Sequence, residues 1–136
     1  MKFKDDIVKD RFQDLAKEAS RLAIEMDEWS VKNYGLELTL TETVSTRGED
    51  TRLLRVSDTH RTRRAFDVRV KDLPESLVAE LCSYFRKKYT NLGALTPNQR
   101  SLIVYKPHGT GPHLHVQLDR KYALPEISYG GQDGKS

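Results

Sequence analysis

Three of the four histidines, His108, His113 and His115, lie within eight residues of one another. His113 and His115 flank Leu114 in a segment that alternates as a β-strand does. Successive side chains of a strand point to opposite faces, so the two imidazoles share one face, a few ångströms apart. Such a pair can hold one metal ion, or it can be two surface histidines beside a turn.

A second group of polar residues, from His60 to Asp67, precedes this pair in the sequence. Asp67 stands between two apolar residues of a predicted strand, so its carboxylate points to solvent or to a polar cavity. On a solvent-facing strand it would pair with Arg64 or Arg69. In a polar cavity it would serve as a metal ligand.

Together the two groups supply two imidazoles and one carboxylate, which leaves the fourth tetrahedral position open for water. That is the ligand set of a catalytic zinc ion. Bound zinc lowers the pKa of its water to about 7 and polarises a carbonyl group. We therefore expect one Zn²⁺ per chain, with His113 as the neighbouring base or hydrogen-bond donor.

The pattern His60-x-x-x-x-Ala65-x-Asp67, followed by His113-x-His115 on a strand, resembles a known family of zinc peptidases. The family contains D-alanyl-D-alanine carboxypeptidases and L-alanyl-D-glutamate endopeptidases, and it shares its fold with the Hedgehog signalling domain. The resemblance implies that His60, Asp67 and His115 are the zinc ligands and that His113 lies beside the reacting carbonyl.

The resemblance covers residues 36–119, where the predicted elements follow the family's order. It implies a hydrolase that cleaves peptidoglycan peptides containing D-residues and a free or side-chain carboxylate. Arg47, which follows the first strand, is placed like the family's substrate-binding arginine. Its guanidinium could bind a carboxylate with two parallel hydrogen bonds, or it could be a solvated loop residue.

The chain departs from the family at three positions. Arg63 replaces a glycine between the first two ligands, and Asp58 replaces a serine. Pro112 occupies the place of an acidic general base three residues before the last ligand. If His113 were that ligand, Thr110 would fall at the base position and could not act as one, so we assign the second histidine of the pair to the metal.

The bulk composition is that of one soluble globular domain, residues 1–136, with 37% hydrophobic and 32% charged residues. Cys82 is the only cysteine, which excludes a cysteine-rich zinc site and an intramolecular disulfide. We find no apolar run long enough for a membrane span and no secretory signal. We expect a cytoplasmic protein as synthesised. The resemblance to the zinc peptidases then implies a phage lysis enzyme, or endolysin, that reaches the cell wall on lysis.

The net charge of +3 is mild. Basic residues are scattered among acidic ones, so we do not expect nucleic-acid binding. Peptidoglycan peptides are the expected partners.

The periodicity predicts an α+β fold in which helices flank a small antiparallel sheet. The last residues, about 125–136, are predicted to form a loose tail. The other predicted elements are a helix over 4–32, a strand over 36–41, a polar loop over 45–59, a strand over 65–70, a helix from Pro74 to about Tyr89, and strands over 102–105 and 114–118.

The predicted helix over 4–32 carries an apolar stripe with alternating spacings of four and three residues. Either the stripe packs on the rest of the domain, or it is a coiled-coil seam that joins two chains in a weak dimer. The stripe consists of Val8, Phe12, Leu15, Ala19, Leu22, Met26 and Trp29.

Two other classes of function are open. His60-Arg61-Thr62 and His108-Gly109-Thr110 both read His-x-Thr, the paired motif of two-histidine phosphoesterases, which need no metal. Alternatively, the same fold could serve as a non-catalytic metal-binding or structural module of a phage particle.

Overall fold

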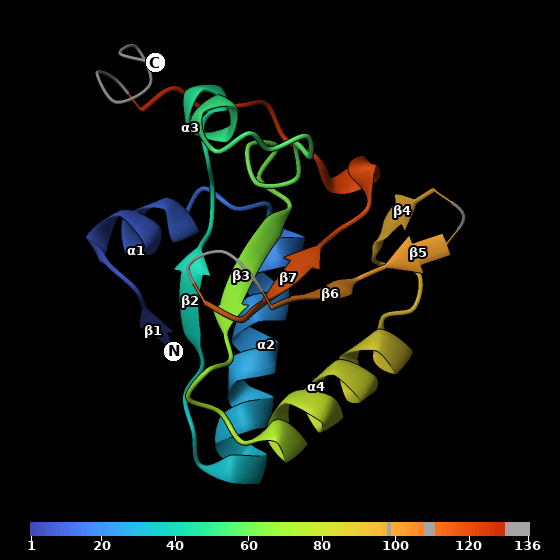
Figure 1. Cartoon of the computed structure of the whole chain (residues 1–136). Coiled ribbons are helices and arrows are strands. Elements are labelled where there is room, and N and C mark those ends of the chain that lie inside the picture. The colour runs from blue at the N-terminus through green and yellow to red at the C-terminus, as the bar shows by residue number, and fades with distance from the viewer. Residues whose placement is uncertain (98, 108–110, 130–136) are drawn as a thin grey trace.

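The computed structural model describes residues 1–97, 99–107 and 111–129. It contains a five-stranded sheet, ordered β1-β2-β3-β7-β6, and a separate two-stranded sheet, β4-β5 (Figure 1). The predicted α+β class is therefore confirmed. The strands are β1 (Lys2–Phe3), β2 (Thr39–Glu42), β3 (Ala65–Arg69), β4 (Ala94–Thr96), β5 (Gln99–Ser101), β6 (Ile103–Lys106) and β7 (His113–Gln117); the helices are α1 (Asp6–Phe12), α2 (Lys17–Tyr34), α3 (Arg47–Arg52), α4 (Glu75–Lys88) and a 3₁₀ turn, η1 (Arg120–Tyr122).

The large sheet is mixed, because the edge strand β1 pairs with β2 in parallel. The prediction of a purely antiparallel sheet is wrong at this edge. Only two residues form β1, too few to give an alternating pattern, so the sequence shows no sign of it. The remaining pairs, β2–β3, β3–β7 and β6–β7, are antiparallel.

Helices cover one face of the large sheet, and α2 runs behind the strands in Figure 1. Phe66 and Val68 of β3 and Leu114 and Val116 of β7 are fully buried in this core, together with residues of α2 and α4. Because side chains alternate along a strand, the opposite face carries Asp67, His113 and His115. The sheet thus separates an apolar core from a polar face.

The predicted helix over 4–32 is divided into α1 and α2. Its apolar spacing continues across the break, but the backbone N–H of Ala16 donates to the carbonyl of Arg63 instead of to its own helix. This tertiary hydrogen bond joins the break to the loop that carries His60. Most of the apolar stripe is buried inside the same chain, so it packs as core and does not form a coiled-coil seam.

Residues 45–59 are not entirely a loop, because they contain α3. Thr46 caps this helix in a capping box: its side chain accepts from the N–H of Glu49, and the carboxylate of Glu49 accepts from the N–H of Thr46. The strand predicted over 36–41 is displaced to 39–42. Asp27 accepts a hydrogen bond from the N–H of Leu38, which holds that residue ahead of the strand.

The other predicted elements agree with the structure. The strand over 65–70 is β3, the helix after Pro74 is α4, and the last two strands are β6 and β7. The described part of the predicted tail is not loose, because Tyr129 donates to Asp14 and its ring lies against Arg11. Residues 130–136 lie outside the described residues. Within the described chain, no helix is long and apolar enough to cross a membrane.

Candidate metal centre

Asp67 and His115 face each other across adjacent strands. They are register partners in the antiparallel pair β3–β7, so their side chains leave the sheet on the same face. Nδ1 of His115 lies 2.9 Å from Oδ1 of Asp67. Two strands anchored in the core by Phe66 and Leu114 therefore fix the carboxylate and one imidazole.

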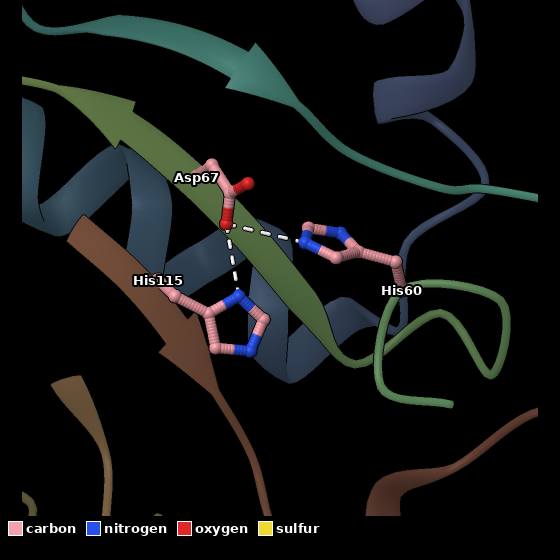
Figure 2. A group of neighbouring side chains, drawn as sticks. All are labelled: His60, Asp67 and His115. Atoms are coloured by element: carbon pink, nitrogen blue, oxygen red, sulfur yellow. Dashed lines mark hydrogen bonds and ion pairs between the residues drawn. The ribbon is translucent and has the colours of Figure 1, made fainter. Parts of the chain in front are cut away.

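His60 reaches the same carboxylate from the loop before β3. Its Nε2 atom is 3.1 Å from Oδ1 of Asp67 (Figure 2). The loop is held in place because the carbonyl of His60 accepts from the N–H groups of Arg63 and Ser45. The sequence placed His60 ahead of the strand, and the structure brings it to Asp67.

Arg63 lies in the turn that joins His60 to β3. Its φ angle is +67°, in the left-handed region that glycine adopts without strain. The turn between His60 and Asp67 therefore has a backbone conformation that a non-glycine residue rarely adopts. In this chain the arginine compensates with its side chain, since Nε donates to the carbonyl of Asp14 at 2.6 Å.

The three side chains form a compact, buried group. One nitrogen from each histidine and one oxygen of Asp67 all lie within 4.8 Å of one another. His60, Asp67 and His115 are only 5%, 6% and 9% exposed. The solvent-facing alternative for Asp67 is wrong, because it is buried and contacts both histidines, whereas Arg64 pairs with Asp58.

In each ring, the nitrogen that points away from Asp67 donates a hydrogen bond to a fixed acceptor. Nδ1–H of His60 donates to the carbonyl of Thr43 at 2.6 Å. Nε2–H of His115 donates to the side-chain oxygen of Gln117 at 3.1 Å, and the amide nitrogen of Gln117 donates in turn to the carbonyl of Ser101. The remaining nitrogens, Nε2 of His60 and Nδ1 of His115, both point at Asp67.

Such outer hydrogen bonds are the usual second shell of metal-binding histidines, because they fix the tautomer and the ring orientation. Without a cation, two lone pairs and a carboxylate oxygen would face one another at about hydrogen-bond distance. A proton on one ring satisfies only one of the two contacts with Asp67, whereas a metal ion between the rings satisfies both. The residues present therefore fit a metal ion, and His60, Asp67 and His115 could hold one.

The electrostatics agree with a site that attracts positive charge. Burial opposes charging of His60, but the carboxylates of Asp67 and Glu42 outweigh it and raise the pKa of His60 to about 9. Burial likewise opposes ionisation of Asp67, yet His60 and His115 hold its pKa well below the ordinary value. The pKa of His115 is lowered, chiefly by burial, while the hydrogen bond with Asp67 acts in the opposite direction.

His113 lies at the margin of this group. Its Nε2 atom is 3.7 Å from Oδ2 of Asp67, and its Nδ1–H donates to the carbonyl of Gly111 at 3.0 Å. The side chain is 20% exposed, more than either of the other two histidines. It is therefore placed next to the metal centre but outside the tight group of ligand atoms.

Glu42 is a neighbour that the sequence analysis missed. It is the register partner of Asp67 on β2, and its Oε2 atom lies 3.8 Å from Nδ1 of His60. Arg55 grips its carboxylate with both terminal nitrogens. Strict alternation would place Glu42 on the apolar face of Leu40, but an irregularity in the strand between these two residues, which the sequence does not reveal, pairs it with Asp67.

Gln117 and Thr59 were also missed. Both contact Nε2 of His115, Thr59 through its hydroxyl at 3.2 Å. Gln117 could have been found, because it lies two residues after His115 on the same strand and therefore on the same face. Thr59 comes from the loop, whose path no local pattern specifies.

Arg47 does not lie free beside the metal centre. Its guanidinium forms a two-pronged contact with Glu126, Nε to Oε1 at 3.2 Å and Nη2 to Oε2 at 2.7 Å. A carboxylate of the same chain thus occupies the fork that was expected to bind substrate. Arg61 approaches Glu126 as well, at 3.8 Å.

The second His-x-Thr motif, at 108–110, lies outside the described residues. In the first, His60 points into the group with Asp67, and the Thr62 hydroxyl donates to the carbonyl of Asp58. When the chain is compared with known proteins, no family model, curated protein or solved structure matches it significantly. Its function is therefore inferred from the geometry of its own residues.

Proposed function

We propose that this chain is a zinc-dependent peptidase that cleaves peptidoglycan peptides, of the D-Ala-D-Ala carboxypeptidase or L-Ala-D-Glu endopeptidase type. One observation carries the proposal: two histidine nitrogens, each with its opposite nitrogen hydrogen-bonded, converge on one carboxylate oxygen within 4.8 Å. Two imidazoles and a carboxylate are a typical catalytic zinc set. The Hedgehog-like fold and the phage lysis role belong to the same proposal.

His60, Asp67 and His115 would hold the ion. When bound, zinc supplies a Lewis acid for the scissile carbonyl and an acidified water molecule. The residues of the chain do the rest: Gln117 and the carbonyl of Thr43 orient the two imidazoles, and the sheet keeps Asp67 out of bulk water. This fixed geometry avoids reorganisation during the reaction.

His113 is the residue that would handle the proton or stabilise the developing negative charge. It is more exposed than the ligands and its Nε2 atom faces the Asp67 side of the centre. Because Nδ1–H donates to the carbonyl of Gly111, Nε2 is the ring nitrogen that is available for proton transfer. Pro112 has no side chain that could act as a base, so this work falls to the histidine that follows it.

The test combines metal analysis with a cleavage assay. The purified protein should contain about one zinc per chain and should release D-alanine or a shortened peptide from muropeptides. Chelation should abolish cleavage and added zinc should restore it, whereas His60→Ala should be inactive under all conditions. A fully zinc-loaded wild-type protein that cleaves no muropeptide would contradict the peptidase proposal.

A second candidate is a metal-binding module without catalysis, such as a structural part of a phage particle. Pro112 at the position of the family's acidic base favours it, as does Glu42, whose carboxylate is already paired with Arg55. Gel filtration and wall digestion on the same sample separate the two. A monomer that digests wall fragments supports the enzyme, and an inert, zinc-loaded assembly supports the module.

A further inference from the structure

Four basic side chains gather at one end of the polar face of the sheet, beside the metal centre. Lys4, Arg69 and Lys71 line a small pocket of about 60 Å³ together with His113. Lys106 extends the group on the other side, because it is the register partner of His113 in the pair β6–β7. We call Lys4, Arg69, Lys71 and Lys106 the basic patch.

The sheet register places two residues of the patch, Arg69 and Lys106, on the same face as the candidate zinc ligands. Arg69 is paired with His113 across β3–β7, two residues along from the pair of Asp67 with His115. Side chains two residues apart on a strand share a face. The positive charge of Lys106 reaches His115 as well, where it adds to the larger effect of burial in lowering the pKa of that histidine.

No carboxylate of the described residues forms an ion pair with the basic patch. Within the described part of the chain, none of its four cations has a carboxylate within 4.0 Å, although ten pairs of a lysine or arginine with a carboxylate occur elsewhere in it. Asp5, the acid next to Lys4 in sequence, instead caps α1 by accepting from the N–H of Val8. Three cations around one small pocket, with Lys106 on the neighbouring strand, favour an external anion.

From this placement we infer that the basic patch binds the carboxylate on the substrate residue that follows the scissile bond. The inference rests on the proposed peptidase function for its substrate. It transfers the carboxylate-binding role from Arg47, which Glu126 engages, to Arg69 and Lys106 with support from Lys4 and Lys71.

The spacing fits one substrate residue. Positions two apart on a strand, such as His113 and His115, are separated by about 6.8 Å. A peptide residue spans about 3.6 Å at most, and a contact of about 2 to 3 Å is added at each end. One residue with its two contacts is somewhat longer than this backbone separation, and two residues would exceed it much further, so a carbonyl at the candidate ligands and a carboxylate in the patch fit best on neighbouring residues.

This geometry selects among peptides. The last D-alanine of a D-Ala-D-Ala peptide carries its free carboxylate on the residue after the scissile bond, and so does a γ-linked D-glutamate after L-alanine. A peptide whose next residue is neutral would leave four cations unpaired. A nucleic-acid strand needs a longer cationic track than a pocket of about 60 Å³ provides, so the peptide carboxylate is the better match.

The experiment uses the full-length, zinc-loaded chain and matched substrates. Cleavage is measured for an acetylated peptide ending in D-Ala-D-Ala as the free acid and as the carboxy-terminal amide. Wild type should prefer the acid. Arg69→Gln and Lys106→Gln should each raise KM for the acid about tenfold, with kcat, the amide reaction and zinc content little changed. Arg21→Gln, an exposed cation of α2 on the other side of the sheet, is the matched control.

Arg47→Gln decides between the two arginine assignments. Loss of acid preference in Arg47→Gln, with the preference retained in both patch variants, would overturn the inference. Equal cleavage of acid and amide by wild type would also overturn it, while leaving the peptidase function intact.

A binding measurement separates failure of the inference from failure of the function. Binding of N-acetyl-D-alanine and of its amide is followed by NMR on the metal-free chain, so that neither zinc nor turnover contributes. Preference for the acid that disappears in Arg69→Gln supports the patch even if no peptide is cleaved. An octathymidylate that binds the patch while the acid does not would overturn it in favour of a nucleic-acid surface.

Discussion

Asp67 on β3 and His115 on β7 are direct partners across the sheet, and their side chains meet at 2.9 Å on its polar face. This pairing brings together residues 48 positions apart in the sequence. Nε2 of His60, which lies on a loop, contacts the same carboxylate oxygen. The candidate metal centre is therefore built mainly on rigid strands, with one candidate ligand on a loop that its own backbone hydrogen bonds hold in place.

The ligand assignment predicts the effect of removing any one of the three residues. His60→Ala and Asp67→Ala should each reduce zinc from about one per chain to nearly none, because three protein ligands leave no spare. Zinc is measured by mass spectrometry after gel filtration, with Asp72→Asn as an exposed carboxylate control. Full zinc occupancy in both ligand variants would show that the metal binds elsewhere.

A separate prediction concerns Gln117, whose side-chain oxygen accepts a hydrogen bond from His115. Gln117→Leu removes the acceptor of the His115 Nε2–H and should weaken zinc binding about 10- to 100-fold. Gln117→Glu keeps an oxygen at this position and should retain most of the affinity. Competition with a fluorescent chelator measures both, and Gln99→Ala serves as the control. Equal losses in the leucine and glutamate variants would indicate a packing role for Gln117 instead.

The pKa of His60 predicts proton release on metal binding. Zinc needs the lone pair of Nε2, so an imidazolium must lose its proton first. Since the pKa is raised to about 9, His60 carries that proton in the metal-free protein at neutral pH. Zinc should displace about one proton per chain near pH 7.5 and almost none above about pH 10.

Calorimetry in two buffers of different ionisation enthalpy measures this number of protons. A proton count near zero at pH 7.5 would show that His60 is neutral before zinc arrives.

The raised pKa of His60 also affects the stability of the fold in the absence of metal. Because the folded pKa of His60 lies above its ordinary value of 6.5, the stabilisation is fully present below that pH. This stabilisation is lost as the pH rises through about 9.

The sequence was most informative where the local pattern and the tertiary structure agree. The alternation around Asp67 and the His113-x-His115 pair placed these side chains on one face correctly, because a strand has a fixed period of two. The break between α1 and α2 could not be predicted, since a hydrogen bond from Ala16 to the distant Arg63 overrides a continuous helical periodicity. The helix α3 was also missed, because residues 45–59 were predicted as a loop, although the spacing of Thr46 and Glu49 is that of the capping box that starts this helix.

The neighbours of the ligands were harder to infer. Glu42 and Thr59 come from different elements, and only the sheet register and the path of the loop bring them to the histidines. Arg47 shows the opposite case. The resemblance implied either a substrate-binding arginine or a solvated loop residue at this position, and the structure shows instead that Glu126, far along the chain, engages its guanidinium. Contacts between distant segments are the part of the site that spacing alone does not specify.

His113 provides the sharpest test, because it separates chemistry from metal binding. Its Nε2 atom lies near Asp67 but outside the compact group of ligand atoms, so His113→Ala should keep most of the zinc. It should lose most of the rate, roughly a hundred- to ten-thousand-fold, the usual value of acid–base or oxyanion assistance. His115→Ala should lose both metal and rate. His108→Ala, outside the described residues, should matter much less.

Zinc content and muropeptide cleavage are measured in parallel for these three variants. The two histidines share a strand and a face, so general damage to the fold cannot produce opposite effects on metal binding. Zinc lost from His113→Ala but kept in His115→Ala would reverse the two roles. Zinc kept in His113→Ala, together with a wild type that cleaves no peptide, would favour the non-catalytic module, because His113 would then have no substrate carbonyl to serve.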